Sequence, residues 1–108
     1  MATIDLPQGT LDLLVLRVLS AGEMHGWGIA RRLNILSREA LQLQEGTLYP
    51  ALYRMEAKGW IESHWAASDN NRRAKYYRLT KVGRTQLETH KASWDRLKTV
   101  IALVMQNA

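Results

Sequence analysis

The sequence contains no cysteine, which excludes disulfides and thiolate metal sites. It also lacks a long apolar run. The longest run near the C-terminus is VIALVM, far short of the roughly 20 apolar residues that a membrane-spanning helix requires. The N-terminal stretch MATIDLPQGT has no basic region followed by a long apolar segment, so it does not resemble a secretory signal peptide. We therefore expect a soluble, cytoplasmic protein.

What the sequence does contain is a surplus of positive charge. Its 108 residues include 15 Lys and Arg against 10 Asp and Glu, which gives a net charge of +5. A chain of this length predicts one domain with a modest core. The positive charge favours an anionic partner, but by itself it does not decide between nucleic acid and a membrane surface.

The first third of the chain predicts two helices. LDLLVLRVL follows Thr10, the expected helix cap, and is apolar on nearly every side. A helix of this kind must be buried on more than one face, which in a short chain points to a partner subunit. In HGWGIARRLNILS, a second apolar stripe at helical spacing consists of Trp27, Ala30, Leu33 and Leu36.

The rest of the chain predicts a helix, two strands and a long helix. The third helix is expected over about residues 47–58. WIESHWA and KYYRL read as two strands, joined by the turn-forming residues of SDNNRRA. Thr80 is expected to cap a last helix over about residues 81–106. This order predicts a mainly α fold with a small β-hairpin: a winged helix-turn-helix domain over residues 1–79 and a C-terminal dimerisation helix over residues 80–108.

The third helix has two different faces. On a helical wheel, Leu48, Leu52 and Met55 share one side. The opposite side carries hydroxyls and one cation, groups that can bond a phosphate or a base edge. Pro50 fits this interpretation because a missing N–H costs nothing in the first turn of a helix. We therefore predict that the helix contacts DNA through Thr47, Tyr49, Pro50, Tyr53 and Arg54.

The two tyrosines of this helix leave an alternative open. Each could be a core residue whose hydroxyl reaches the surface. Of the two, Tyr49 is the stronger candidate for a DNA contact, and Tyr53 is expected to be partly structural.

The turn between the two strands is a second candidate site. Arg72, Arg73, Lys75 and Arg78 lie within seven positions, and Asp69 is the one acid nearby. A basic wing beside a helix-turn-helix can reach a minor groove or its phosphates. The alternative is a solvated surface turn. Beside a recognition-type helix we favour a DNA contact, and we predict it for Arg72 and Arg73.

The last helix carries apolar residues at spacings of seven, three, four and three, which is a heptad-like seam. At about 1.5 Å per residue it is near 39 Å long, more than a small winged domain can cover. One alternative is a stripe that packs on the chain's own domain. Another is a membrane-surface helix, against which the acids on its polar face argue. We predict a two-fold homodimer that has no membrane partner, with Leu11, Leu14, Leu87, Trp94, Leu97, Ile101 and Val104 in its interface.

Nothing in the sequence predicts catalysis, a cofactor or a metal site. His25, His64 and His90 lie in three different elements, and no H-E-x-x-H motif is present. GWGIAR begins like a dinucleotide-binding fingerprint, but no strand precedes it and Arg31 stands where the third glycine is needed.

Three segments, HGWGIARRL, GTLYPALYRMEAKGWI and AKYYRLT, together resemble the PadR family of bacterial transcriptional regulators, in an order that matches across nearly the whole chain. The single C-terminal helix is similar to that of the smaller PadR subfamily. The resemblance implies a homodimeric repressor that binds an inverted-repeat operator, often with ATGT and ACAT halves. It implies that Thr47, Tyr49 and Pro50 enter the major groove and that Arg54 contacts the DNA backbone. It also implies wing contacts by Arg72, Arg73 and Lys75.

The resemblance also implies a small aromatic or drug-like effector between the subunits, for which Trp94 is the candidate contact. The alternative is that Trp94 only packs across the interface, which its helical spacing favours. A different class of function is a winged-helix module that binds protein or RNA without operator specificity. In that case the heptad helix would be the docking surface.

Overall fold

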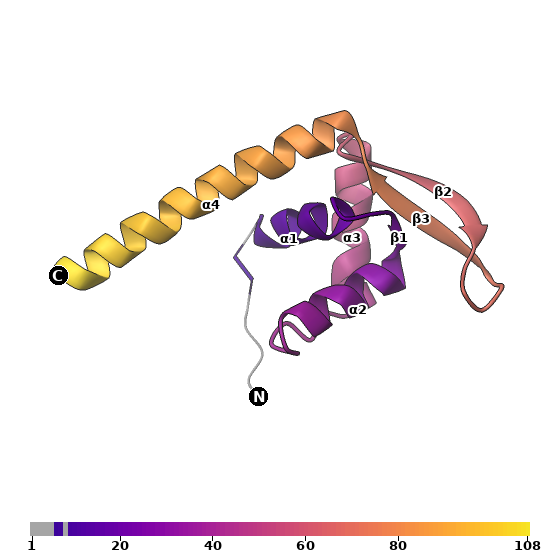
Figure 1. The fold of residues 1–108 in the computed structure, drawn as a ribbon, viewed down its shortest axis with the longest axis horizontal. Coiled ribbons are helices and arrows are strands. Elements are labelled where there is room, and N and C mark those ends of the chain that lie inside the picture. Colours follow the sequence, from indigo (N-terminus) through magenta and orange to yellow (C-terminus); the bar gives the residue numbers. More distant parts are fainter. Residues whose placement is uncertain (1–5, 8) are drawn as a thin grey trace.

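The computed structural model describes residues 6, 7 and 9–108 (Figure 1). This part of the chain forms a small sheet beside three short helices, with one long helix leading away from them. In chain order the elements are α1 (Thr10–Leu19), β1 (Met24–His25), α2 (Gly26–Leu36), α3 (Glu45–Ala57), β2 (Ile61–Ala67), β3 (Arg73–Leu79) and α4 (Lys81–Asn107). The predicted fold class, a winged helix-turn-helix followed by a long helix, is confirmed.

The sheet has three strands in the order β1, β3, β2, and neighbouring strands are antiparallel. β2 and β3 form the predicted hairpin, and β1 adds the pairs Met24 with Tyr77 and His25 with Tyr76. The predicted hairpin is therefore confirmed, and the third strand, β1, was not predicted. A strand of two residues is too short to show an alternating pattern. Because β1 pairs with β3 and α2 begins directly after β1, this short strand holds the start of α2 beside the hairpin.

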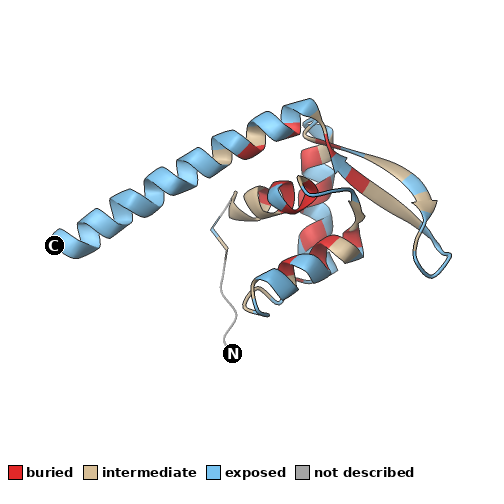
Figure 2. Cartoon of the chain, in the orientation of Figure 1, coloured by how far each residue is buried: buried red, intermediate tan, exposed pale blue. Residues whose placement is uncertain are grey.

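The core lies where α1, α2 and α3 meet the base of the hairpin (Figure 2). The apolar face predicted for α3 is confirmed, since Leu48, Leu52 and Met55 are fully buried. On α1, Leu11 and Leu14 are only partly buried against this core. One side of α1 is therefore left half open to solvent.

The apolar stripe predicted for α2 is wrong at both of its ends. Ala30 and Leu33 are buried as expected, but Trp27 and Leu36 are exposed, and Ile29 takes the central core position instead. The start of α2 explains part of this difference. His25 caps the helix by accepting the Gly28 N–H at Nδ1, 3.0 Å away. This start turns Ile29 toward the core and Trp27 away from it.

Two predicted helix starts also need correction. Thr10 does not cap α1: the cap position is Gly9, in the left-handed conformation with φ 87°, and no side chain bonds there. α3 begins at Glu45, so Pro50 lies in its second turn and not its first. The Gly46 carbonyl therefore lacks its usual N–H partner. Gly46 is exposed, so water can replace that bond.

The junction between the hairpin and α4 is tightly packed. Thr80 caps α4 as predicted, and its Oγ1 accepts the Gly83 N–H at 3.0 Å. A methyl group on Gly83 would lie 1.9 Å from the Trp60 carbonyl oxygen. The first turn of α4 therefore sits directly on the backbone that precedes β2, and only glycine fits at position 83.

Beyond this junction, α4 projects away from the rest of the molecule (Figures 1 and 2). Leu87 is the last of its residues to be buried, with 7% of its surface exposed. The prediction that places Leu87 in a dimer seam is wrong, because Leu87 completes the core of its own chain. Residues 91–108 are exposed throughout. Among the described residues, no helix is both long and apolar enough to cross a membrane.

Candidate nucleic-acid interface

The outer face of α3 carries the predicted contact residues at the surface. Thr47, Tyr49, Pro50, Tyr53 and Arg54 are all exposed, while the inner face of the helix is buried. The two faces of α3 are thus as different in the fold as on the helical wheel. The outer face offers hydroxyl groups close to the positive end of a helix, a combination suited to phosphate oxygens.

The relative exposure of the two tyrosines of α3 is the reverse of what the sequence led us to expect. Tyr53 is 78% exposed, whereas Tyr49 is 42% exposed. Tyr49 leans against α2, where a methyl group on Gly26 would lie 2.7 Å from the Tyr49 hydroxyl oxygen. Tyr49 is therefore the more structural of the two, and the glycine of the HGW segment makes room for its ring.

Burial raises the pKa of Tyr49 above its usual value of 10.0, and the nearby Glu45 carboxylate raises this pKa further. The phenol is therefore neutral at physiological pH. A neutral phenol can donate a hydrogen bond to a phosphate or base acceptor.

Arg54, predicted to contact the DNA backbone, already has a partner within the chain. Its Nη2 lies 2.6 Å from Oδ1 of Asp12, and Asp12 is 5% exposed. The pair joins α1 to α3 and neutralises a carboxylate that would otherwise be buried alone. The Arg54 side chain is half exposed, so part of its guanidinium still faces solvent.

The wing, residues 68–75, presents its two arginines differently from its lysine. Arg72 and Arg73 are exposed, and no carboxylate of the described chain lies within ion-pair distance of them. Arg73 lies over the ring of Trp65, 5.2 Å from its centroid. The turn itself is closed by Ser68, whose Oγ donates to the Arg72 carbonyl. These contacts hold the two cations at the tip.

Lys75 is turned back toward α3. Its Nζ lies 3.5 Å from Oε1 of Glu56, and Ser63 on β2 donates to the other oxygen of the same carboxylate. Glu56 thus ties both strands of the hairpin to α3. Lys75, predicted as a DNA contact, is thus paired with a carboxylate of α3, unlike Arg72 and Arg73.

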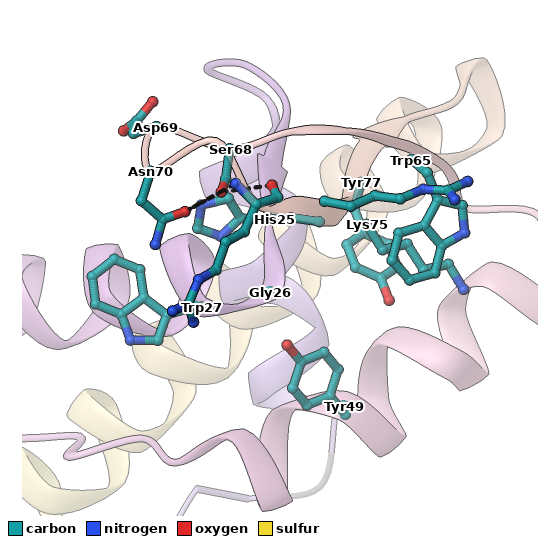
Figure 3. A pocket seen from close by; sticks show the side chains of 13 residues that line it. His25, Gly26, Trp27, Tyr49, Trp65, Ser68, Asp69, Asn70, Lys75 and Tyr77 are labelled. Atoms are coloured by element: carbon teal, nitrogen blue, oxygen red, sulfur yellow. Dashed lines mark hydrogen bonds between the residues drawn. The ribbon is translucent and has the colours of Figure 1, made fainter.

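A cleft of about 620 Å³ lies between the wing, the start of α2 and α3. We call it the wing cleft. Figure 3 shows Trp27 and Trp65 at opposite sides of it, with Gly26 and Tyr49 between them. Arg72, Arg73 and Lys75 also line it, and Asp69 is the one carboxylate among its lining residues.

Three residues of this region have roles that the sequence pattern does not predict. Helical spacing places Trp27 in the core and strand alternation gives Trp65 no special role, yet both indoles line the wing cleft. The Asn34 amide makes two bonds to the Leu43 backbone, at 3.0 and 2.6 Å. These bonds hold the connector that leads into α3. No periodic pattern marks any of the three, because their roles depend on contacts that only the fold creates.

Comparisons with known proteins agree with this architecture. Residues 15–89 match the transcriptional regulator PadR-like family. A transcriptional regulator of Mycobacterium tuberculosis is 30% identical over 93 residues, which cover 86% of this chain and 83% of that protein. A PadR family regulator of Clostridium difficile is 35% identical with a TM-score of 0.77, over 90% of this chain and 99% of that one. A PadR-like regulator of Bacillus cereus is 32% identical with a TM-score of 0.80, over 94% and 96%.

The fold and the exposed face of α3 define a winged-helix regulator of transcription. More particularly, the chain belongs to the PadR-like family. PadR regulators bind DNA, are typically dimeric and are generally not enzymes. The family resemblance seen in the sequence is thereby confirmed.

Proposed function

We propose that this protein is a homodimeric transcriptional repressor that binds an inverted-repeat DNA operator and releases it when an effector binds. The observation that carries the proposal is the contrast between the faces of α3. Its inner face is sealed in the core, while Thr47, Tyr49, Pro50 and Tyr53 are exposed. A helix anchored in this way can enter a major groove without disturbing the domain.

In the proposed complex, the exposed residues of α3 make different kinds of contact with DNA. Thr47 and Tyr53 are free to bond phosphates or base edges. Tyr49 reaches the DNA from a ring held against Gly26, which fixes its direction. Pro50 adds an apolar contact surface. Arg54 contributes to the backbone contact only with the donors that Asp12 leaves free.

The wing supplies the electrostatic part of binding. Arg72 and Arg73 are exposed and carry no ion pair with a described residue, so neither must break one before meeting a phosphate. Lys75 acts mainly by holding the wing to α3 through Glu56. Each phosphate neutralised releases counterions, which makes the affinity fall with salt.

The exposed end of α4 supports the homodimer. Trp94, Leu97, Ile101 and Val104 form the predicted seam, and all are exposed in the single chain. Val100 and Leu103 are exposed beside that seam, so the apolar face is wider than two-stranded pairing needs. In the proposed dimer, the half-open side of α1, with Leu11 and Leu14, covers the part of this apolar face that the partner's α4 does not reach.

In this dimer residues 1–79 bind DNA and residues 80–108 pair the subunits, with residues 1–5 and 8 outside the described part. The two α3 helices would need a separation of about 34–36 Å, one turn of DNA. An effector that binds one arrangement of the dimer more tightly than another shifts this spacing. Trp94 on the seam is the candidate contact for an effector held between the subunits.

The proposal is tested by measuring affinity for the promoter of the protein's own gene and for random duplex DNA over a range of salt concentrations. Replacing Arg72 and Arg73 with alanine should reduce the slope of log K against log salt by about 1.8, or about 0.9 for each phosphate that is no longer neutralised. The matched control is the double replacement of Arg84 and Arg96, which removes the same charge from α4. Equal affinity for promoter and random DNA would contradict the proposal.

A further inference from the structure

The wing cleft has a composition that phosphate binding alone does not require. The indoles of Trp27 and Trp65 are 53% and 56% exposed, and both line the cleft. Large aromatic faces left open to water in a concave site are typical of places where a ligand binds. A purely electrostatic contact with a DNA backbone would need only the arginines.

Each of these indoles is paired with a cation. Arg73 lies over Trp65 at 5.2 Å from the ring centroid, and Arg31 lies over Trp27 at 5.1 Å. Arg73 lines the cleft, so its guanidinium can meet the charged end of a ligand whose ring stacks on Trp65, whereas Arg31 is not among the lining residues. Lys75 is already paired with Glu56. Arg72 and Arg73, against the one lining carboxylate of Asp69, still give the lining a positive balance that favours an anion.

The walls of the cleft are held in place before any ligand arrives. On one side, His25 caps α2 and its ring meets that of Tyr76 edge-on, with centroids 5.3 Å apart. On the other side, Lys75 and Glu56 join the wing to α3. A site whose walls are fixed loses less entropy when it binds a ligand. The volume of about 620 Å³ is within the usual range for small-molecule sites.

We propose that the wing cleft binds a small planar aromatic anion, of the aryl carboxylate or aryl sulfonate class, and that this ligand competes directly with DNA. The ring stacks against Trp65 or Trp27, and the anionic group pairs with Arg72 or Arg73. The competition rests on the proposed function, because the same two arginines serve DNA. This site is separate from Trp94, which lies on α4.

The location can be tested with naphthalene-2-sulfonate as the probe and the four tryptophan indole N–H signals in a ¹H–¹⁵N NMR spectrum as the readout. The signals are assigned with single Trp→Phe variants. We expect Trp27 and Trp65 to shift with a Kd of about 1 mM, typical of a ligand of this size, while Trp60 and Trp94 stay in place. A shift confined to Trp94, or no shift at probe concentrations of about 10 mM, tenfold above that Kd, would overturn the proposal.

The charge requirement has its own controls. Naphthalene-2-methanol has the same ring without the anion and should bind at least about tenfold more weakly, as expected when one charge-assisted hydrogen bond is removed. Arg73→Gln should weaken the sulfonate and leave the alcohol unchanged, whereas Arg96→Gln on α4 should affect neither. Equal binding of the two probes would mean that the cleft selects only for apolar rings, and the proposed anion site would be wrong.

Competition is measured by adding random duplex DNA at low salt to the probe-saturated protein, with DNA binding followed separately by fluorescence anisotropy. The Trp27 and Trp65 signals should then leave their probe-bound positions as DNA binds. If DNA binds and the probe stays, competition is excluded while the proposed function stands. If no DNA binds under any condition, the proposed function fails and competition fails with it; the indole shifts still decide whether the cleft binds the anion.

Discussion

The winged part of the molecule and the free end of α4 differ in how they treat their apolar side chains: the first buries a core of them and the second leaves them exposed. Between Val15 and Leu87 the chain closes a core in which Leu48, Leu52 and Met55 have no exposed surface. Residues 91–107 form regular helix, and yet none of them is buried. One region is complete within a single chain, and the other presents an apolar face with no cover. The difference indicates that the winged part can close its core without cover for the end of α4. Gly83 and Leu87 lie at the boundary between the two regions.

The largest expected effect is at that boundary. Gly83→Ala places a methyl group against the Trp60 carbonyl oxygen, 1.9 Å away, where backbone must move to accept it. We expect a decrease of about 3 kcal/mol in the free energy of unfolding, at the upper end for overpacking. Urea denaturation measures it. The matched control is Gly46→Ala, which meets nothing within 4 Å and should stabilise the exposed helix by up to about 1 kcal/mol. Equal effects would show that the junction is not tightly packed.

The next effect should fall on pairing and leave the winged part intact. Ile101→Asp places a charge in the exposed seam of α4, where burying it in a dimer would be costly. We expect sedimentation equilibrium to show a shift from dimer to monomer. Thr99→Asp, on the polar side of the same turn, should leave the dimer unchanged. A wild-type protein that is monomeric at micromolar concentration would contradict the proposed dimer.

A smaller effect is expected where α2 meets α3. Gly26→Ala pushes the Tyr49 ring away, because the added methyl group would lie 2.7 Å from its hydroxyl oxygen. The ring is partly exposed and can swing aside, so stability should change by less than about 1 kcal/mol. Promoter affinity should fall about tenfold, because the hydroxyl is no longer directed at the DNA.

The double-mutant cycle that includes Tyr49→Ala tests this explanation of the Gly26 effect. In the Tyr49→Ala background, Gly26→Ala should cost little further affinity, since the ring that it displaces is already absent. Full additivity of the two decreases would show that Gly26 acts by some other route.

The smallest effect concerns pH. Burial raises the pKa of Tyr77, and the Glu56 carboxylate raises it further; the pKa of Tyr49 is raised as well. The folded chain therefore holds these phenolic protons more tightly than the unfolded chain. Their stabilising contribution is full below the usual pKa of 10.0 and is lost as the pH rises through the raised values. Urea midpoints should fall above about pH 10. The Tyr77→Phe variant should show a smaller fall, and an equal fall would assign the effect to other groups.

The fold is predictable from the sequence where periodicity is long and regular. The buried face of α3, the hairpin of β2 and β3 and the cap at Thr80 were all predicted correctly. Where a role depends on one contact across the fold, prediction failed. Leu87 fits the heptad spacing, but the spacing cannot show that the chain's own core covers it. Likewise, nothing in the local sequence shows that Gly26 leaves room for Tyr49.

For the candidate site, composition predicted which residues reach the surface but not their partners. Arg72 and Arg73 are exposed as expected of a wing tip. Arg54 and Lys75 meet Asp12 and Glu56, which lie 42 and 19 positions away in the chain. Ion pairs over such separations leave no periodic signal. For the same reason the wing cleft, assembled from three parts of the chain, was not predicted.

In the proposed dimer, the winged part of each chain binds DNA and the ends of α4 hold two such parts together. Hydroxyl-radical footprinting on the promoter of the protein's own gene tests both halves at once. We expect two protected patches related by a dyad and separated by about one turn of DNA, 34–36 Å. Both should disappear together in Ile101→Asp at the same protein concentration. A single patch that is unaffected by Ile101→Asp, or no protection at all, would contradict the proposal.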